Sequence, residues 1–359
     1  MMWHDRRILD LLDIEHPIIL APMGAVSNAE LVGSVSEAGG LGSYGAAGDR
    51  PDRLRTTVQT IRQRTNHAFN INLFSTRAEN YDRDARSGPR LAERLEAYHA
   101  EQGLGPVPDP RALFGPVEEQ FDVLIEEGVP IISFHFGVDA HLVARAREAG
   151  TKVLCSATTV AEAKELEDIG VDAVIAQGSE AGGHRGTFTV DYRQALIGTM
   201  ALVPQVVDAV SVPVIAAGGI MDARGVVASL ALGASAVQMG TAFLCCPEAR
   251  IDDTWRNSLM TAEAEATTVT EAISGKAARG IRTRYIDEIE ALDEPLLPYP
   301  AHYSLSRDLR RAAIEHGNSD FVTMWAGQGV GLIRQRPAAD LVNDLVVESQ
   351  QLLGRLGQN

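Results

Sequence analysis

Cysteine is scarce in this sequence, and its pattern argues against two kinds of protein. The 359 residues include only Cys155, Cys245 and Cys246. An odd number with one adjacent pair is not the framework of a small disulfide-bonded secreted protein. No spacing in the chain suggests a zinc site, so we expect no metal. We expect Cys155 in the core, and no base clearly pairs with Cys245 or Cys246 to make either thiol a nucleophile.

Positive charge and long hydrophobic runs are also scarce. Lysine and arginine number 32 against 48 aspartate and glutamate residues, which gives a formal net charge of −16. Nucleic-acid binding needs a basic surface, so nucleic acid is not an expected partner. No run approaches the roughly 20 apolar residues of a membrane helix, and the N-terminal segment lacks the hydrophobic region of a signal peptide. We therefore expect a cytoplasmic protein without a membrane partner, and its oligomeric state stays open.

Short apolar runs alternate with helix-length segments along the chain. Hydrophobic residues make up 45% and charged residues 22%, as in an ordinary globular protein. Several runs are apolar throughout, which is typical of parallel strands covered by helices. The predicted strands are 17–21, 40–44, 68–74, 131–136, 152–157, 172–177, 213–217 and 235–239. The predicted helices are 28–38, 50–64, 117–127, 139–149, 159–169, 194–210 and 222–232. A count of eight strands favours a closed (β/α)8 TIM barrel over an open doubly wound sheet.

Two segments interrupt the alternation. Residues 75–116 are polar and follow the third strand, so we predict a rim insertion there. Residues 244–359 follow the last strand and have a mostly helical pattern. We predict that the barrel comprises residues 1–74 and 117–243, and that the C-terminal extension covers the active site.

The active site of such a barrel is built from the loops that follow the strands. After the first strand come Ala21, Pro22 and Met23. Pro22 fixes a turn, and Met23 offers a polarisable surface suited to a flat ring. The alternative for this segment is a plain turn with a core methionine.

Amide and imidazole side chains follow on the third and fourth strands. Asn70 and Asn72 are two residues apart and therefore face the same side of their strand. Interior amides need partners, so they suggest a polar ligand, although they can also satisfy each other. His135 ends the fourth strand, where it lines the pocket or serves as a structural interior histidine.

The loop after the sixth strand is the most informative stretch. It runs from Gln177 to Gly186 and is rich in glycine, including Gly182 and Gly183, which permits close backbone approach to a ligand. His184 and Arg185 add a titratable group and a fixed cation. A histidine between glycines has few local packing partners, so we favour a functional role over a structural one.

Glycines also follow the last two strands, where such barrels commonly bind phosphate. Gly218 and Gly219 follow the seventh strand, and the run from Gln238 through Met239 and Gly240 to Thr241 ends the eighth. Backbone amides in such loops attract an anion, although simple tight turns are the alternative. Together the loops suit a flat ligand with one phosphate. No GxGxxG motif opens the chain, so FMN fits better than FAD.

At this point the sequence resembles the nitronate monooxygenase family, FMN enzymes on a TIM barrel, and especially its class I members. The resemblance covers nearly the whole chain. The motifs that carry it are PIILAPM, AGGLGS, FNINLF, SFHFG, VLCSATT, AQGSEAGGHRGTF, PVIAAGGIMDARG, LGASAVQMGTAF, SGKAARG and WAGQG.

The resemblance implies a role for each matching residue. Those implied to contact the flavin are Ala21, Pro22, Met23, Asn72, Gln177, Gly182, Gly183, Gly218, Gly219, Gln238, Met239, Gly240 and Thr241. His184 would be the catalytic base. Tyr299 and Tyr303 would line the substrate pocket with Arg307, which stands where the family has a lysine. Leu113 and Phe114 occupy the neighbourhood of a further expected tyrosine.

The implied reaction is the oxidation of alkyl nitronates, such as propionate 3-nitronate, by O2 to a carbonyl product and nitrite. His184 would take the α-proton of a neutral nitroalkane, or as an imidazolium would stabilise the anion. One alternative is an FMN-dependent NAD(P)H:quinone or enoyl-thioester reductase on the same barrel. Others are a non-redox phosphate-binding barrel enzyme and a non-catalytic binder of flavin or phosphate.

Overall fold

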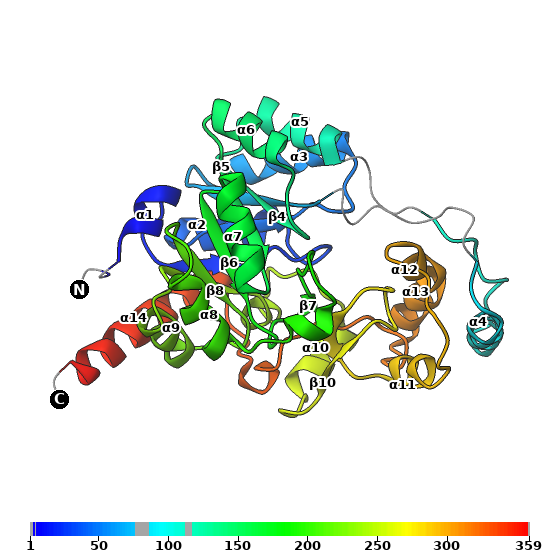
Figure 1. Ribbon diagram of the computed structural model, residues 1–359. Helices are drawn as coiled ribbons and strands as arrows, with labels where there is room; N and C mark the ends of the chain where they lie inside the picture. Colours follow the sequence, from blue (N-terminus) through cyan, green and yellow to red (C-terminus); the bar gives the residue numbers. More distant parts are fainter. Residues whose placement is uncertain (1–2, 4, 76–85, 112–116, 358–359) are drawn as a thin grey trace.

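Eight parallel strands form one sheet in the order β1–β9–β8–β6–β5–β4–β3–β2 (Figure 1). The computed structural model describes residues 3, 5–75, 86–111 and 117–357. The strands are β1 (Ile18–Leu20), β2 (Gly42–Gly45), β3 (Phe69–Phe74), β4 (Ile131–His135), β5 (Lys152–Ala157), β6 (Ala173–Gln177), β8 (Val214–Ala217) and β9 (Ala236–Met239). Leu41 joins the two ends of the sheet: its carbonyl accepts from Leu20 N at 2.9 Å, and its N–H donates to Ile18 O at 3.0 Å. The predicted (β/α)8 barrel and its eight strands are therefore confirmed.

Amphipathic helices cover the outside of this sheet. They are α2 (Ala29–Glu37), α3 (Pro51–Arg62), α5 (Val117–Glu126), α6 (Ala140–Glu148), α7 (Val160–Ile169), α8 (Thr199–Val207) and α9 (Ala223–Ala231). The C-terminal helix α14 (Ala338–Leu356) packs against α2 and α9. Its Leu341, Val342 and Leu345 are buried, so this helix completes the layer around the barrel. The N-terminal helix α1 (Arg7–Leu12), absent from our predicted helices, buries Ile8, Leu9 and Leu12.

The helix predicted over 194–210 begins later in the structure. A 3-10 turn, η2 (Tyr192–Ala195), precedes it, and α8 starts only at Thr199. The Glu180 carboxylate accepts from Thr199 N at 2.9 Å and from its hydroxyl at 2.8 Å. A carboxylate from a distant loop therefore fixes the start of this helix, which local sequence does not encode.

The segment after β9 is less uniformly helical than its pattern suggested. Its helical elements are η3 (Thr241–Phe243), α10 (Asp253–Met260), α11 (Arg284–Glu290), α12 (Ala301–Leu305), α13 (Arg307–His316), η4 (Val330–Leu332) and α14. Between α10 and α11 lies an unpredicted hairpin of β10 (Thr267–Thr270) and β11 (Ala278–Ile281). β11 also pairs with the two-residue β7 (Gly183–His184), which forms a second, antiparallel sheet.

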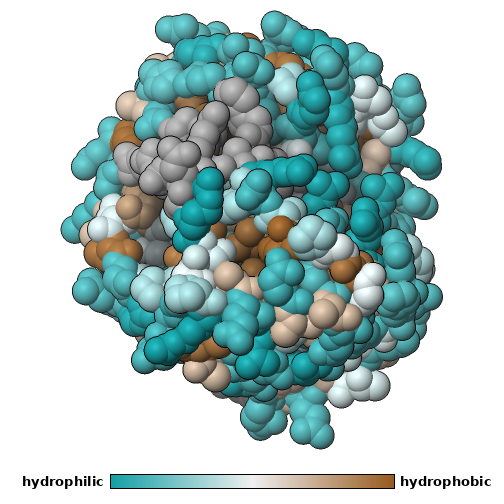
Figure 2. Space-filling model, turned by 90° about the vertical axis from the view of Figure 1, so that its right-hand side faces the viewer, coloured by the Kyte–Doolittle hydropathy of each residue, from teal (hydrophilic) through white to brown (hydrophobic). Residues whose placement is uncertain are grey.

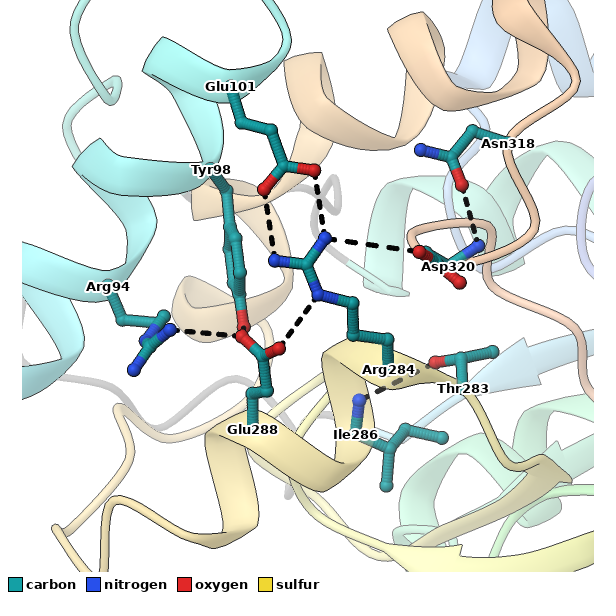
Figure 3. A network of polar contacts seen from close by, with 9 residues as sticks. All are labelled: Arg94, Tyr98, Glu101, Thr283, Arg284, Ile286, Glu288, Asn318 and Asp320. Carbon is teal, nitrogen blue, oxygen red and sulfur yellow. Dashed lines mark hydrogen bonds and ion pairs between the residues drawn. The ribbon is translucent and has the colours of Figure 1, made fainter.

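Helix α4 (Pro89–Glu101), in the predicted rim insertion, lies beside α11 rather than in the layer around the barrel (Figure 1). Arg284 on α11 donates to both carboxylate oxygens of Glu101 at 2.8 and 3.0 Å, and to Glu288 at 2.7 Å (Figure 3). Tyr98 adds a hydrogen bond of 2.9 Å to Glu288. Figure 2 shows the face on this side of the molecule, which is mostly hydrophilic with hydrophobic residues near its centre. The division of the chain into barrel, rim insertion and extension stays a prediction.

Replacing Arg284 with methionine is expected to loosen α4 from α11. The substitution removes a forked ion pair whose components are partly exposed, so we expect a loss of about 1 kcal/mol. Hydrogen exchange of residues 89–101 should accelerate in the variant. Arg311→Met, which removes a single exposed contact of 3.5 Å to Asp308, is the matched control. Unchanged exchange in α4 would contradict a docking role for Arg284.

Candidate active site

A cavity of about 370 Å3 opens at the carboxyl ends of the barrel strands, within the range of ligand pockets. It is lined by every residue that the sequence predicted to contact a flavin, and by His135, His184, Tyr299 and Tyr303. The structure does not bring Arg307 to the cavity. Arg307 is exposed at the start of α13, because that helix buries Leu309, Ala312 and Ala313 on its other side. Leu113 and Phe114 lie outside the described residues.

The loop that carries His184 is held by side chains from the barrel. The Gln177 amide donates to the carbonyl of His184 at 3.0 Å and accepts from Gly186 N at 2.8 Å. His135 Nε2 donates to the same His184 carbonyl at 3.1 Å, and its Nδ1 lies 3.1 Å from the Ser156 hydroxyl. Gln177 and His135 thus position the loop as well as line the cavity.

Arg185, the cation of this loop, has a structural role. Arg185 is fully buried, and its guanidinium donates to the carbonyls of Gly178 at 2.6 Å, Gln177 at 2.9 Å and Ala195 at 3.1 Å. Burial lowers the pKa of Arg185 to about 10. Arg185 therefore stabilises its own loop by bonding backbone carbonyls and does not offer a charge to a ligand.

β-pairing fixes the direction of His184. Gly183, at φ 73°, and His184 pair with Arg279 and Ala278 of β11, and Arg185 N donates to Ala277 O at 2.9 Å. A two-residue strand has no periodicity that a sequence pattern can reveal. This pairing was therefore missed, although SGKAARG was among the motifs.

The hydrogen bonds of Ser274 define the proton on His184. Its hydroxyl donates to the carbonyl of Lys276 at 2.9 Å, so its oxygen accepts from His184 Nε2, also at 2.9 Å. The proton of the neutral imidazole therefore lies on Nε2, and Nδ1 carries the lone pair. Among the described residues no side chain or backbone group is hydrogen-bonded to Nδ1.

Aromatic rings surround this imidazole. Tyr299 lies 4.8 Å and Trp325 5.4 Å from His184 between ring centres, and Phe74 and Phe136 stand slightly farther away. Burial, reinforced by the charges of His135 and Lys276, lowers the pKa of His184 to about 3. The imidazole is therefore neutral at physiological pH, which favours a base over an imidazolium that stabilises an anion.

Three histidines, the buried His302 and the partly buried His135 and His184, should make the protein sensitive to mild acid. Burial lowers the pKa of His135 to about 4, of His184 to about 3 and of His302 to about 4. Below pH 6.5 the unfolded chain binds protons that the folded state excludes, so stability is complete above that pH and falls toward the folded pKa values. We expect a loss of about 1 kcal/mol for each histidine between pH 6.5 and 5.5.

Chemical denaturation at a series of pH values measures the slope of the free energy of unfolding against pH. His302 is not among the residues that line the cavity, and its Nε2 donates to Ala272 O at 2.8 Å. His302→Gln should reduce the slope by about one third, because one of three similar contributions disappears. A free energy of unfolding that is flat from pH 7 to 5 would rule out neutral buried histidines.

The glycine loops after β8 and β9, next to the loop that carries His184, present polar groups that lack partners among the described residues. Among the described residues no acceptor is bonded to the N–H groups of Gly219 and Gly240, and the buried Gln238 Oε1 has no donor. Thr241 Oγ1 accepts from Gly327 N at 2.9 Å, which leaves its proton to donate elsewhere. Free amide donors and an orphaned acceptor on one wall fit a ligand with a phosphate and hydrogen-bond donors.

The two asparagines of β3 have different surroundings. Asn72 lines the cavity, and its Nδ2 donates to the Ser133 carbonyl at 3.1 Å and hydroxyl at 3.0 Å. Asn70 lies deeper in the barrel and donates to the hydroxyls of Ser43 at 3.1 Å and Ser133 at 2.9 Å. Asn70 is thus an interior amide whose Oδ1 has no hydrogen-bond partner among the described residues, whereas Asn72 faces the cavity.

The WAGQG segment lines the cavity and links the loop after β6 to the loop after β9. Trp325 stands beside His184, Gly327 bonds Thr241, and Gln328 N donates to the carbonyl of Glu180 at 2.9 Å. A Cβ at Gly182 would lie 2.7 Å from Gly327 N, so only glycine permits this approach. The cavity is therefore enclosed by residues from both ends of the chain.

The cysteines lie away from this chemistry. All three are buried, as expected for Cys155, and burial raises the pKa of Cys246 to about 12. A thiol held protonated in this way is a poor nucleophile. Within the described part of the chain, no group of three or more acidic, histidine or cysteine side chains is placed to hold a metal. No described helix is both long and apolar enough to cross a membrane.

Comparisons with known proteins agree with this geometry. The model of a family described as nitronate monooxygenase matches residues 5–348. A probable nitronate monooxygenase of Staphylococcus aureus (strain MSSA476) is 38% identical over 360 residues, 98% of this chain and 99% of that protein. The solved nitroalkane oxidase from Streptomyces ansochromogenes is 35% identical with a TM-score of 0.88, covering 98% and 99% of the two chains. FabK from Thermotoga maritima is 31% identical with a TM-score of 0.78, covering 99% of each chain.

Proposed function

Because the chain belongs to the nitronate monooxygenase family and is a flavin-dependent oxidoreductase, we propose that it uses FMN and O2 to oxidise alkyl nitronates. Substrates such as propionate 3-nitronate would yield a carbonyl product and nitrite. The observation that carries this proposal is the unprotonated Nδ1 of His184 beside a cavity that is also lined by Gly219 and Gly240, whose N–H groups are unpaired among the described residues. We place the enzyme in the cytoplasm as part of the same proposal.

FMN is supported by the donor set of the cavity. Gly219 and Gly240 would hold its phosphate with Thr241, while Asn72 and Gln238 would bond the ring or the ribityl chain. Ala21, Pro22 and Met23 lie along the same cavity and would line the flat ring. Bound FMN supplies the electron acceptor that side chains lack.

His184 would act as a general base toward neutral nitroalkanes. Its Nδ1 would accept the α-proton, while Ser274 and the backbone pairing to β11 hold the ring in place. Because burial lowers the pKa of His184, the neutral imidazole offers Nδ1 as a proton acceptor, so we favour the base over the imidazolium role. The rings of Tyr299 and Trp325 pack against the imidazole, at 4.8 and 5.4 Å between ring centres.

The similarity to FabK keeps one alternative open. An FMN-dependent NAD(P)H:quinone or enoyl-thioester reductase would use the same glycine loops, because these contact only the cofactor. The two functions differ in the electron donor: the nitronate itself, or NAD(P)H.

Anaerobic mixing of the yellow protein with propionate 3-nitronate, and separately with NADH, tests the proposal. We expect the flavin absorbance to bleach with nitronate, and nitrite to form once O2 is admitted. Bleaching by NADH alone, followed by reoxidation with a quinone or an enoyl thioester, would replace the proposal by the reductase function.

A further inference from the structure

Lys276 is a cation near the active site that has no anionic partner among the described residues. It is half-buried, and its Nζ lies 4.4 Å from the centre of the Phe136 ring. The ion pairs of the described residues do not include it. The charges of Glu271 and Glu162 act on the pKa of Lys276 only from a distance. Both carboxylates have other partners: Glu271 pairs with Arg193 at 3.4 Å, and Glu162 accepts from the Thr187 hydroxyl and from Phe188 N.

The backbone of Lys276 is tied to the catalytic histidine. Its carbonyl accepts from the Ser274 hydroxyl at 2.9 Å, and that hydroxyl oxygen accepts from His184 Nε2. Between them Gly275 has φ 76°, and a Cβ there would lie 2.0 Å from Leu297 O. The turn is therefore restricted to glycine, and Lys276 keeps a fixed relation to His184.

The ring beneath the ammonium is also fixed. Phe136 has φ 69°, a left-handed conformation that costs a non-glycine residue about 1–2 kcal/mol. Its side chain is buried, 4.9 Å from Phe74 and 6.3 Å from Tyr299 between ring centres. Phe74 and Tyr299 line the cavity, whereas Phe136 and Lys276 are not among its lining residues. The ammonium of Lys276 therefore lies one aromatic ring, that of Phe136, away from the cavity wall.

A half-buried ammonium without an anion nearby is energetically unfavourable. Burial disfavours its charged form and lowers its pKa. A cation–π contact offsets only about 0.5–2 kcal/mol of this cost. An anionic ligand beside Lys276 would offset the rest of the free-energy cost of burying the charge.

We propose that Lys276 binds anionic oxygens of the substrate and thereby selects anionic substrates for this pocket. The inference rests on the proposed nitronate function for the identity of the substrate. It assigns to Lys276 the charge that the sequence had placed at Arg307, which the structure leaves on the surface. The oxygens belong either to the nitronate group or to a distal carboxylate.

Two substrates separate these sources. Propionate 3-nitronate carries both groups, whereas ethyl nitronate carries only the nitronate. Lys276→Met should raise the KM for propionate 3-nitronate by about 10- to 100-fold, since one charge-assisted contact is lost. An equal rise with ethyl nitronate would assign the nitronate oxygens, and no rise with ethyl nitronate would assign the carboxylate. Unchanged KM values for both substrates would overturn the proposal.

Binding of succinate, a dianion of similar size that the enzyme does not oxidise, gives a readout independent of turnover. Calorimetry should show binding to the flavin-loaded wild type and a loss of about 10-fold or more in Lys276→Met and Lys276→Gln. Lys276→Arg, which retains the charge, should recover part of the affinity. Lys164→Met, on the exposed face of α7, is the matched control and should bind like the wild type.

The outcomes distinguish this inference from the proposed function. Succinate binding that depends on Lys276 in a protein that does not oxidise nitronates would retain the anion site and reject the nitronate function. Nitronate oxidation with succinate affinity unaffected by Lys276→Met and Lys276→Gln would retain the nitronate function and reject the anion site at Lys276. Loss of succinate affinity in Arg307→Met, with Lys276→Met unchanged, would return the role to Arg307.

Discussion

Replacing His184 with alanine is expected to lower kcat/KM for neutral nitroethane by about 10²–10⁴-fold, the usual contribution of a general base. The same variant should lose much less activity with preformed ethyl nitronate, which has no α-proton to remove. The physical reason is that Nδ1 of a neutral imidazole is the acceptor and Ser274 fixes the proton on Nε2. Nitrite release and O2 uptake, measured with both substrates, give the two rates.

His184→Asn and Ser274→Ala refine this experiment. Asparagine retains polarity without basicity, so it should behave like alanine. Ser274→Ala removes the partner of Nε2 and should have a smaller effect, again larger with nitroethane than with nitronate. His141→Ala, an exposed histidine on α6, is the matched control. Equal losses of His184→Ala on nitroethane and nitronate would show that His184 binds the anion and does not abstract the proton.

Replacing Gly219 with valine is expected to yield protein that purifies largely without flavin. Gly219 has φ 72°, and a Cβ there would lie 3.2 Å from the Glu180 Cβ. The side chain would strain the loop and displace an N–H that faces the cavity. Strain of about 1–2 kcal/mol and one lost charge-assisted hydrogen bond together weaken cofactor binding by roughly 100-fold. The ratio of flavin to protein absorbance measures the loss, and chromatography of the released flavin identifies it as FMN or FAD.

Gly150→Val controls for the backbone conformation alone. Gly150 has φ 77° at the end of α6, and no atom lies within 4 Å of its added Cβ. This variant should lose about 1–2 kcal/mol of stability and keep its flavin. A Gly219→Val protein that retains full flavin occupancy would remove the glycine loops from the cofactor site. Free FAD instead of FMN would correct the identity of the cofactor.

The barrel could be predicted because its information is local. Each strand, such as Ile18–Leu20 or Ala173–Gln177, is a short apolar run buried on both faces. Glycines at the helix ends, such as Gly170 at φ 97°, adopt a backbone conformation that few other residues tolerate. In a (β/α)8 barrel the loops after the strands meet at one rim, so strand order alone brought Met23, Asn72, His184 and Gly219 to one cavity.

Only the tertiary structure decided what these side chains do. Arg185 closes its own loop and Arg307 faces solvent, while the backbone of Lys276 is linked to His184 through Ser274. Sequence spacing carries no information on such contacts, because each depends on which segment of the distant C-terminal region folds back over the barrel. The tautomer and neutrality of His184 likewise arise from Ser274, 90 residues away, and from burial among rings of other segments. The sequence by itself thus determined the barrel and the positions of the loops, and the long-range packing decided which groups carry charge, hold protons and face the cavity.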